Sequence, residues 1–223
     1  MEINSDEKDD CLFTWDNMDL HFVPYYPTNQ KKYLVNCLNQ RNRNHKDIWL
    51  IYSKVETSVN NIVKDLEENK ANMDLEDDIF VTLDVGEEIE IWELYRIAPE
   101  FPIQSIKIGN WSQSLRLQMT SLHKWQRRKN LKGHHFKITA LPERPFIFDM
   151  AINHITKKYE IKGSLGDLLE LYAKTLNFTY TIEPPPDNTW GLLLENGSWN
   201  GMINLVHKEL VDIGKCTTMY INS

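Results

Sequence analysis

Three Asn-x-Ser/Thr triplets carry the clearest chemical meaning in this 223-residue chain. Asn110, Asn177 and Asn196 each begin such a triplet, which is the acceptor pattern for an N-linked glycan. The modification takes place only on chains that enter the secretory pathway. The triplets therefore predict glycosylation at these three asparagines and favour an extracellular or luminal location.

Other reactive side chains do not form a site that can be recognised from spacing. His134 and His135 precede an expected strand, but no carboxylate or cysteine stands at a matching metal-ligand distance in the sequence. Cys11, Cys37 and Cys216 are widely spaced, and a Cys11–Cys37 disulfide is left open. No nucleophile elbow, phosphate loop, dinucleotide fingerprint or zinc-protease motif occurs. We expect no metal and no cofactor, and a binding protein rather than an enzyme.

Charge and hydropathy exclude several broad classes. The chain has 25 Lys and Arg against 32 Asp and Glu, a net charge of −7, which argues against broad binding to nucleic acid or anionic lipid. No stretch approaches the ~18 consecutive apolar residues of a membrane helix. The first ten residues are polar and acidic, unlike a signal peptide. Taken alone, these features favour an acidic cytosolic protein.

The amino-terminal half alternates between strand and helix patterns. Residues 28–42 predict a helix capped by Thr28, and residues 48–52, 79–83 and 89–97 predict strands. Between the first two strands, an apolar stripe from Val55 to Leu66 predicts an amphipathic helix whose polar face includes Asp65. This order predicts a βαβ unit with a parallel sheet, ending near Pro102. We assign residues 1–102 to an amino-terminal α/β region and 103–130 to a linker.

The carboxyl-terminal part predicts a second, small α/β lobe over residues 131–223. Strands are expected at 136–141, at 178–182 and from 211 onward. Helices are expected from Ser164, with Asp167 completing a partial capping box, and over 201–210. One face of the first helix is expected to carry Leu165, Leu168, Leu169, Tyr172 and Leu176. The resulting order is β–α–β–α–β.

An ordered series of short motifs runs through this second part. It comprises Trp125-Gln126-Arg127-Arg128-Lys129-Asn130-Leu131-Lys132-Gly133, Phe136-Lys137-Ile138-Thr139, Glu143-Arg144-Pro145-Phe146, Leu176-Asn177-Phe178-Thr179-Tyr180, Asn196-Gly197-Ser198-Trp199-Asn200-Gly201-Met202 and Glu209-Leu210-Val211-Asp212-Ile213-Gly214. The stretch resembles the first ligand-binding segment of ionotropic glutamate receptors. More narrowly, its first motif and the strand at 91–97 resemble the acid-sensing clade of the insect antennal ionotropic receptors.

This resemblance implies a fold and a function. The fold class is α/β, a partial periplasmic-binding-protein-like lobe preceded by a smaller βαβ-type amino-terminal region. The implied function is the extracellular ligand-binding portion of a ligand-gated cation channel subunit that detects odorants. Its ligand would be a small carboxylic acid or amine, and its partners would be co-receptor subunits of a hetero-oligomeric channel. Attachment to the cell membrane would come from segments absent from this chain, which is therefore expected to be a fragment.

The resemblance also implies binding residues. Glu143 matches an acidic residue that faces the ligand near the end of the first strand, and Thr217 matches a binding position after the last strand. The aromatic residue that stacks over the ligand falls on Ile161, with Tyr159 two positions away. Met219 replaces a hydroxyl-bearing residue, and the carboxylate-binding arginine would fall directly after Ser223. These departures from the glutamate-binding pattern suit the chemosensory branch.

Three other interpretations stay open on the sequence. The chain can be a soluble periplasmic-type small-molecule binding protein, which a hydrophobic pore segment in a longer transcript would exclude. It can be a cytosolic α/β enzyme, against which glycosylation at Asn177 or Asn196 would count. It can also be an unstable fragment without function. One lobe of a two-lobed site is expected to bind its ligand weakly.

Overall fold

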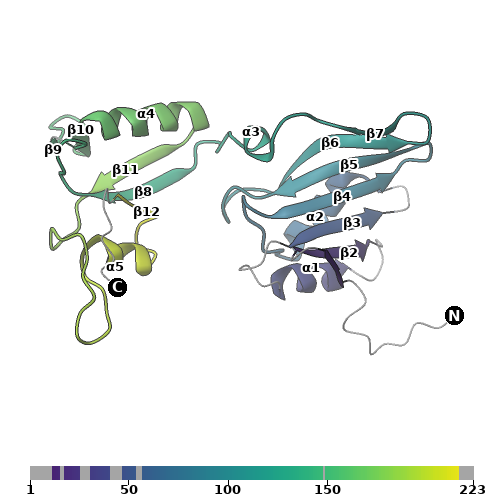
Figure 1. Ribbon diagram of the computed structural model, residues 1–223, viewed down its shortest axis with the longest axis horizontal. Coiled ribbons are helices and arrows are strands. Elements are labelled where there is room, and N and C mark those ends of the chain that lie inside the picture. Colours follow the sequence, from purple (N-terminus) through teal and green to yellow (C-terminus); the bar gives the residue numbers. More distant parts are fainter. Residues whose placement is uncertain are drawn as a thin grey trace. The chain divides into compact units, whose positions relative to one another are not determined.

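The computed structural model describes residues 12–15, 18–25, 31–40, 47–53, 57–147 and 149–215. The chain forms two compact units, Met1–His123 and Lys124–Ser223 (Figure 1). Thr28, Val55, Cys11 and Cys216 lie outside the described residues. The mixed α/β class expected from the sequence is confirmed in both units.

The described part of the first unit contains a seven-stranded sheet whose spatial order follows the sequence. Its strands are β1 (Leu12–Trp15), β2 (Met18–Pro24), β3 (Ile48–Ser53), β4 (Asp78–Asp84), β5 (Glu88–Tyr95), β6 (Gln104–Ser112) and β7 (Arg116–Met119). Strands β2, β3 and β4 are parallel, whereas the pairs from β4 to β7 are antiparallel. The predicted βαβ arrangement is thus confirmed for part of a mixed sheet.

Two helices supply the crossovers that parallel pairing requires. They are α1 (Lys31–Gln40), between β2 and β3, and α2 (Val59–Glu68), between β3 and β4. Alternate residues of β3 and β4, including Ile51 and Val81, are buried in one cluster with residues of both helices. Both helices therefore pack on the same face of the sheet. Burying each large apolar side chain contributes about 1.5–3 kcal/mol.

Helix α2 follows the predicted apolar stripe, with one correction. Val59, Ile62 and Leu66 are buried as expected. Asp65, predicted on the polar face, is also buried, and its carboxylate accepts a hydrogen bond from the Tyr25 hydroxyl. The sequence pattern missed this burial because the partner of Asp65 comes from a segment 40 residues away.

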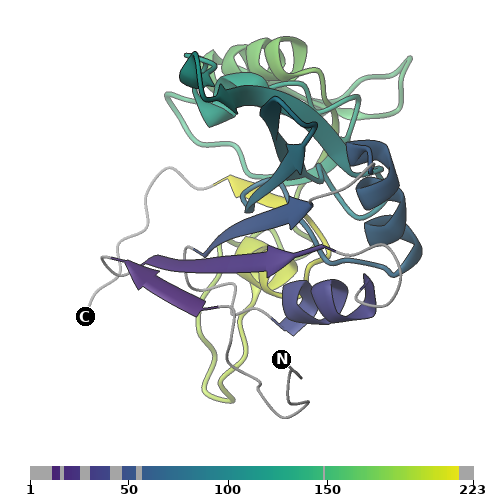
Figure 2. The same ribbon diagram turned by 90° about the vertical axis from the view of Figure 1, so that its right-hand side faces the viewer.

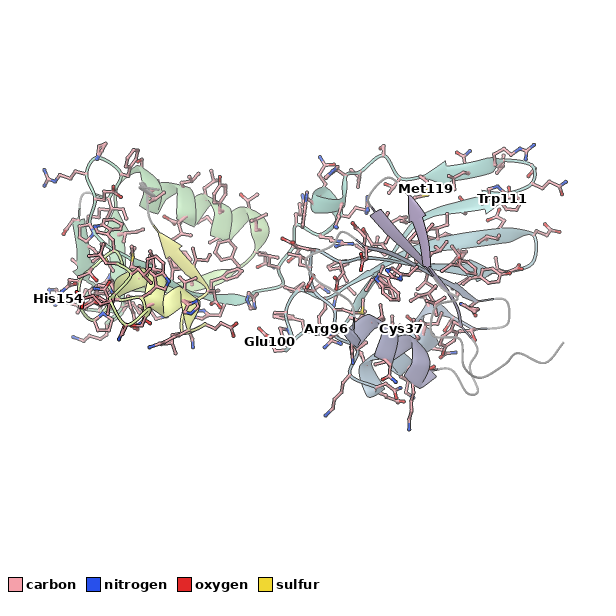
Figure 3. The ribbon with its side chains drawn as sticks, turned by 60° about the horizontal axis from the view of Figure 1, so that its bottom comes forward. Cys37, Arg96, Glu100, Trp111, Met119 and His154 are labelled. Atoms are coloured by element: carbon pink, nitrogen blue, oxygen red, sulfur yellow. The ribbon has the colours of Figure 1, made fainter. Side chains whose placement is uncertain are left out.

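Residues 103–130 differ from the predicted linker. β6 pairs with β5 over eight residues and β7 extends the sheet, so the boundary between the units follows His123. All four residues of β7 are exposed, and burial therefore does not impose an alternating pattern on this edge strand. Trp111 on β6 pairs with Leu117, and Met119 lies opposite Gly109 (Figure 3). A Cβ atom at Gly109 would collide with the backbone carbonyl oxygen of Gln118 on β7, so the hairpin requires glycine there.

The second unit is a small parallel sheet with a helix on each side. It begins with α3 (Lys124–Arg127), and the strands β8 (His135–Ala140), β11 (Thr179–Glu183) and β12 (Ile213–Lys215) form the order β11-β8-β12. Helix α4 (Ser164–Leu176) leads to β11 and helix α5 (Gly201–His207) leads to β12. Figures 1 and 2 show α4 and α5 on opposite sides of the sheet. The predicted β–α–β–α–β order is confirmed.

A hairpin of β9 (Asp149–Ile152) and β10 (Tyr159–Lys162) lies between β8 and α4. Ile161 of this hairpin packs with Leu165 and Leu169 of α4 against the buried cluster of Ile138, Ala140, Ile147 and Ile182. Two other residues of the predicted apolar face of α4, Leu168 and Tyr172, are 39% and 50% exposed. The buried stripe of α4 is therefore narrower than the sequence pattern suggested.

The amino terminus of α4 also differs from the prediction. Gly163, at φ 126°, is the N-cap, and no side chain makes the capping hydrogen bond, so Ser164 and Asp167 do not form a capping box. Gly166 is buried in the first turn, where an added Cβ would stand 2.5 Å from the Ile161 carbonyl oxygen. The absence of a side chain at Gly166 lets the hairpin approach the helix.

Replacing Tyr25 by Phe is expected to lower the free energy of unfolding by about 1–3 kcal/mol, because Asp65 loses a buried donor. Burial, and then the hydrogen bond and charge of Asp65, raise the pKa of Tyr25 above 10.0. The stability linked to this group is therefore present below that pH and is lost as the pH rises further. In denaturant titrations, raising the pH from about 9 to about 11 should lower the free energy of unfolding less for Tyr25→Phe than for the wild type. Tyr52→Phe is the control, and equal losses in Tyr25→Phe and wild type would contradict the prediction.

Replacing Gly166 by Ala is expected to destabilise the protein. Helix propensity alone would favour alanine by about 1 kcal/mol. The contact with the Ile161 carbonyl forces a backbone shift that costs about 1–3 kcal/mol. Circular dichroism during thermal unfolding measures the net effect. Ser164→Ala, at an exposed position two residues earlier, should change stability by less than about 0.5 kcal/mol; a stabilised Gly166→Ala protein would show that the helix and hairpin can move apart.

Candidate functional site

The carboxyl ends of the parallel strands define the candidate site in the second unit. The central strand β8 ends at Ala140, β11 at Glu183 and β12 at Lys215. Connections to the two outer strands pass over opposite faces of the sheet, so the loops diverge between the ends of β8 and β12. In open α/β sheets, ligands bind at this topological switch point. We therefore expect binding residues in the segment that follows β8.

Glu143 lies in that segment, within a tight turn from Glu143 to Ile147. The Ile147 amide donates to the Glu143 carbonyl at 2.7 Å, and the Glu143 amide donates to the Ile147 carbonyl at 3.1 Å. Ile147 is 2% exposed and anchors the turn in the core. The Leu165 amide donates to the Phe146 carbonyl at 3.3 Å, which ties the turn to the start of α4.

The side chain of Glu143 extends from this hydrogen-bonded turn. The residue is half-buried, and in the described part of the chain its side chain forms no hydrogen bond or ion pair. A partly buried carboxylate without a partner favours a cationic or hydrogen-bond-donating group. Chemically, the turn can therefore receive an ammonium group of a small ligand.

The two candidates for the stacking position lie two residues apart on β10 and have different surroundings. Ile161 is partly buried and packs against the core cluster, and its carbonyl lies against Gly166 of α4. Tyr159 is half-buried and pairs with Ile152 at the opposite end of the hairpin. At ~3.3 Å per residue, Tyr159 is about 7 Å further along the strand from α4. Ile161, like the Glu143 turn, thus contacts the first turn of α4, and Tyr159 is more distant.

The remaining predicted binding positions, Thr217 and Met219, lie outside the described residues. The described residues contain no group of three or more His, Cys, Asp or Glu side chains suited to a metal ion. His135 is instead placed across from β11, with Nδ1 2.9 Å from the Thr179 hydroxyl and Nε2 3.2 Å from the Thr181 hydroxyl. Its ring thus bridges two strands.

Asp187 organises the loop between β11 and α5 and is not among the binding residues predicted from the sequence. Its carboxylate accepts hydrogen bonds from the Gly201 amide at 2.9 Å and the Thr189 amide at 3.2 Å. Partial desolvation acts to raise the pKa of Asp187, but these donors outweigh it and the pKa is lowered. An Asp two residues before a Thr, after a run of prolines, is an Asx-turn pattern that could have identified this residue.

The three predicted glycosylation positions occupy different environments. Asn110 lies within β6, Asn177 is the C-cap of α4, and Asn196 lies in the loop between β11 and α5. Among the described residues, no helix is both long and apolar enough to cross a bilayer.

Residues 134–223 match the family model of the ligated ion channel L-glutamate- and glycine-binding site. The matched residues fall within the second unit and include the turn of Glu143, the hairpin of Tyr159 and the position of Thr217. The family match and the carboxyl-end geometry therefore point to the same unit of the chain.

Curated relatives are similar over about half of this chain. The kainate-type ionotropic glutamate receptor glr-3 of Caenorhabditis elegans is 32% identical over 111 residues, which are 48% of this chain and 13% of that receptor. Ionotropic receptor 25a of Drosophila melanogaster is 30% identical over 112 residues, 50% of this chain and 11% of the relative. The chain thus spans only about a tenth of the length of these relatives. Both relatives are named as receptors, not as enzymes.

Among solved structures, a glycine complex of an ionotropic glutamate receptor ligand-binding domain from Mnemiopsis leidyi is 27% identical to this chain. Its TM-score is 0.32, and the match covers 36% of this chain and 33% of that one. The similarity of this chain to the receptor family therefore rests on the sequence matches. From residue 134 to residue 223, the chain is similar to the glutamate- and glycine-binding domain of ionotropic glutamate receptors.

Proposed function

We propose that this chain contributes part of the extracellular ligand-binding domain of a ligand-gated cation channel subunit, and that the subunit serves chemosensation. The single observation that carries the proposal is the match of residues 134–223 to the family model of the glutamate- and glycine-binding site. The matched segment forms a parallel lobe whose loops diverge at a switch point, an arrangement suited to binding a small molecule.

The chemosensory role is supported by two features. An insect ionotropic receptor is among the relatives that share about half of this chain. The position of the stacking aromatic residue in glutamate-binding receptors is taken here by Ile161, which is partly buried and packs against the core cluster. Without an aromatic face at this position, the site lacks the stacking contact for glutamate, which supports a small carboxylic acid or amine as the ligand. Co-receptor subunits and a place in the cell membrane are part of the same proposal.

The mechanism follows from differential binding to two arrangements of the domain. A ligand shifts a conformational equilibrium only when it binds one state more tightly than the other. In the proposed receptor, a second lobe closes over the ligand held at the end of β8, and closure pulls on the channel. The turn of Glu143 suits this role, because its hydrogen bond to Leu165 of α4 and its anchor at Ile147 attach it to the lobe.

Glu143 sets the preference for cationic groups in this proposal. Replacing Glu143 by Gln keeps the size of the side chain and removes its charge, so binding of a primary alkyl amine or of glycine should weaken about tenfold or more. Binding of a short monocarboxylic acid should not weaken, because that ligand has no ammonium group for the carboxylate. NMR titration of the full chain measures both affinities by following the backbone amides of the non-proline residues from 141 to 147.

Glu195→Gln is the matched control, because it makes the same charge change at an exposed loop residue. The control should retain wild-type amine binding. Two results would contradict the proposal: equal effects of the two substitutions, or a panel of glycine, glutamate, alkyl amines and short carboxylic acids that leaves the 141–147 resonances unmoved.

A further inference from the structure

The loop between β11 and α5 presents one of the three glycosylation triplets at an open tip. Figures 1 and 2 show this loop extending away from the sheet of the second unit. All residues from Leu192 to Ser198 are exposed. The Leu194 amide donates to the Ser198 carbonyl at 2.8 Å and the Gly197 amide donates to the Leu194 carbonyl at 2.9 Å, so the tip is a closed turn. Nothing lies within 4 Å of a Cβ built on Gly197.

From this geometry we propose that Asn196 is the N-glycosylated residue of the folded protein and that Asn110 and Asn177 are not. The inference rests on the proposed extracellular location. In the reaction, the Asn196 side-chain nitrogen bonds to C1 of the first sugar of a lipid-linked diphosphate oligosaccharide. The bond from C1 to the diphosphate oxygen breaks, the lipid diphosphate leaves, and the amide proton passes to a base of the transferase.

The side chain of Asn196 is arranged for this reaction. Its Oδ1 accepts hydrogen bonds from the Ser198 amide at 3.0 Å and from the Ser198 hydroxyl at 2.7 Å. Two donors on the oxygen draw electron density toward it and make the amide N–H groups more acidic. Within the described residues, the Asn196 Nδ2 atom has no hydrogen-bond partner. The nitrogen that must accept the sugar is therefore unengaged at the tip of an exposed turn.

Asn110 is in the opposite situation. Its main chain is paired on both sides, with Glu90 of β5 and Gln118 of β7, and its Nδ2 donates to the Glu88 carboxylate at 3.0 Å. The hydroxyl residue of its triplet, Ser112, is 5% exposed and accepts from the Leu115 amide. Once both edges of this strand are paired, Asn110 cannot enter a transferase. A glycan added to the nascent chain at this position would displace the Glu88 contact.

Asn177 is exposed but engaged by the fold. It ends α4 in the left-handed conformation at φ 54°, and its Nδ2 donates to Asn130 Oδ1 at 2.8 Å. Its carbonyl accepts from the Gly133 amide at 2.8 Å. The hydroxyl of its triplet, on Thr179, is 2.9 Å from the His135 ring. The acceptor amide therefore bonds to a residue just before β8, and the triplet hydroxyl bonds to the first residue of β8. A glycan on Asn177 would compete with these hydrogen bonds.

To test the inference, eukaryotic cells express the full 223-residue chain with an added signal peptide and secrete it. Glycopeptide mass spectrometry of the folded, secreted wild-type protein should find a glycan on Asn196 and unmodified Asn110 and Asn177. Asn196→Gln and Ser198→Ala should each abolish the gel shift that peptide N-glycosidase removes. Ser198→Thr, which retains the hydroxyl, should preserve that shift.

Site mapping on the wild-type protein does not depend on whether an Asn110 or Asn177 variant folds. A glycan found on Asn110 or Asn177 of the secreted protein, or an unmodified Asn196, would overturn the inference. Failure of the proposed binding function would look different, because it would appear as a missing Glu143-dependent amine response with the glycan still on Asn196. In turn, Asn196→Gln should leave that amine response unchanged.

Discussion

The second unit depends on the parallel pairing of one central strand. β8 must satisfy its backbone donors and acceptors on both sides, with β11 on one edge and β12 on the other. Near the start of the β12 pairing, Asp212 holds both polar groups of the Lys137 backbone: its carboxylate accepts from the amide at 2.7 Å, and its own amide donates to the carbonyl at 2.9 Å. This arrangement gathers the loops at one edge and sets the position of the Glu143 turn.

Much of this fold is predictable because burial imposes simple periods on the sequence. Ile51 and Val81 alternate with half-buried residues along β3 and β4, and Ile62 and Leu66 repeat along α2. The hairpin of β6 and β7 carries no such pattern, because its edge residue Leu117 is 56% exposed. An exposed edge strand and a solvated connector have similar sequences, so the boundary of the first unit could not be derived from composition.

The candidate site was predictable only in part. Glu143 is close to the end of a strand with a clear pattern, so its place at the edge of the sheet follows from the position of β8. The separation of Tyr159 from that edge depends on the register of the β9–β10 hairpin, which pairs Tyr159 with Ile152 and Ile161 with Met150. Burial of Asp65 and the role of Asp187 likewise depend on contacts between distant segments, which periodicity does not encode.

The order of strands in the second unit also has a consequence for synthesis of the chain. The side chain of His135 on β8 meets Thr181 on β11 from 46 residues away, and Lys137 meets Asp212 from 75 residues away. The central strand is therefore made first and completed last, and one edge stays open until Ile213–Lys215 leaves the ribosome. During that interval the loop of Asn196 has already emerged on a chain whose sheet is unfinished. Contacts so distant in sequence make folding slow, which lengthens the time when chaperones can act on the open edge of β8.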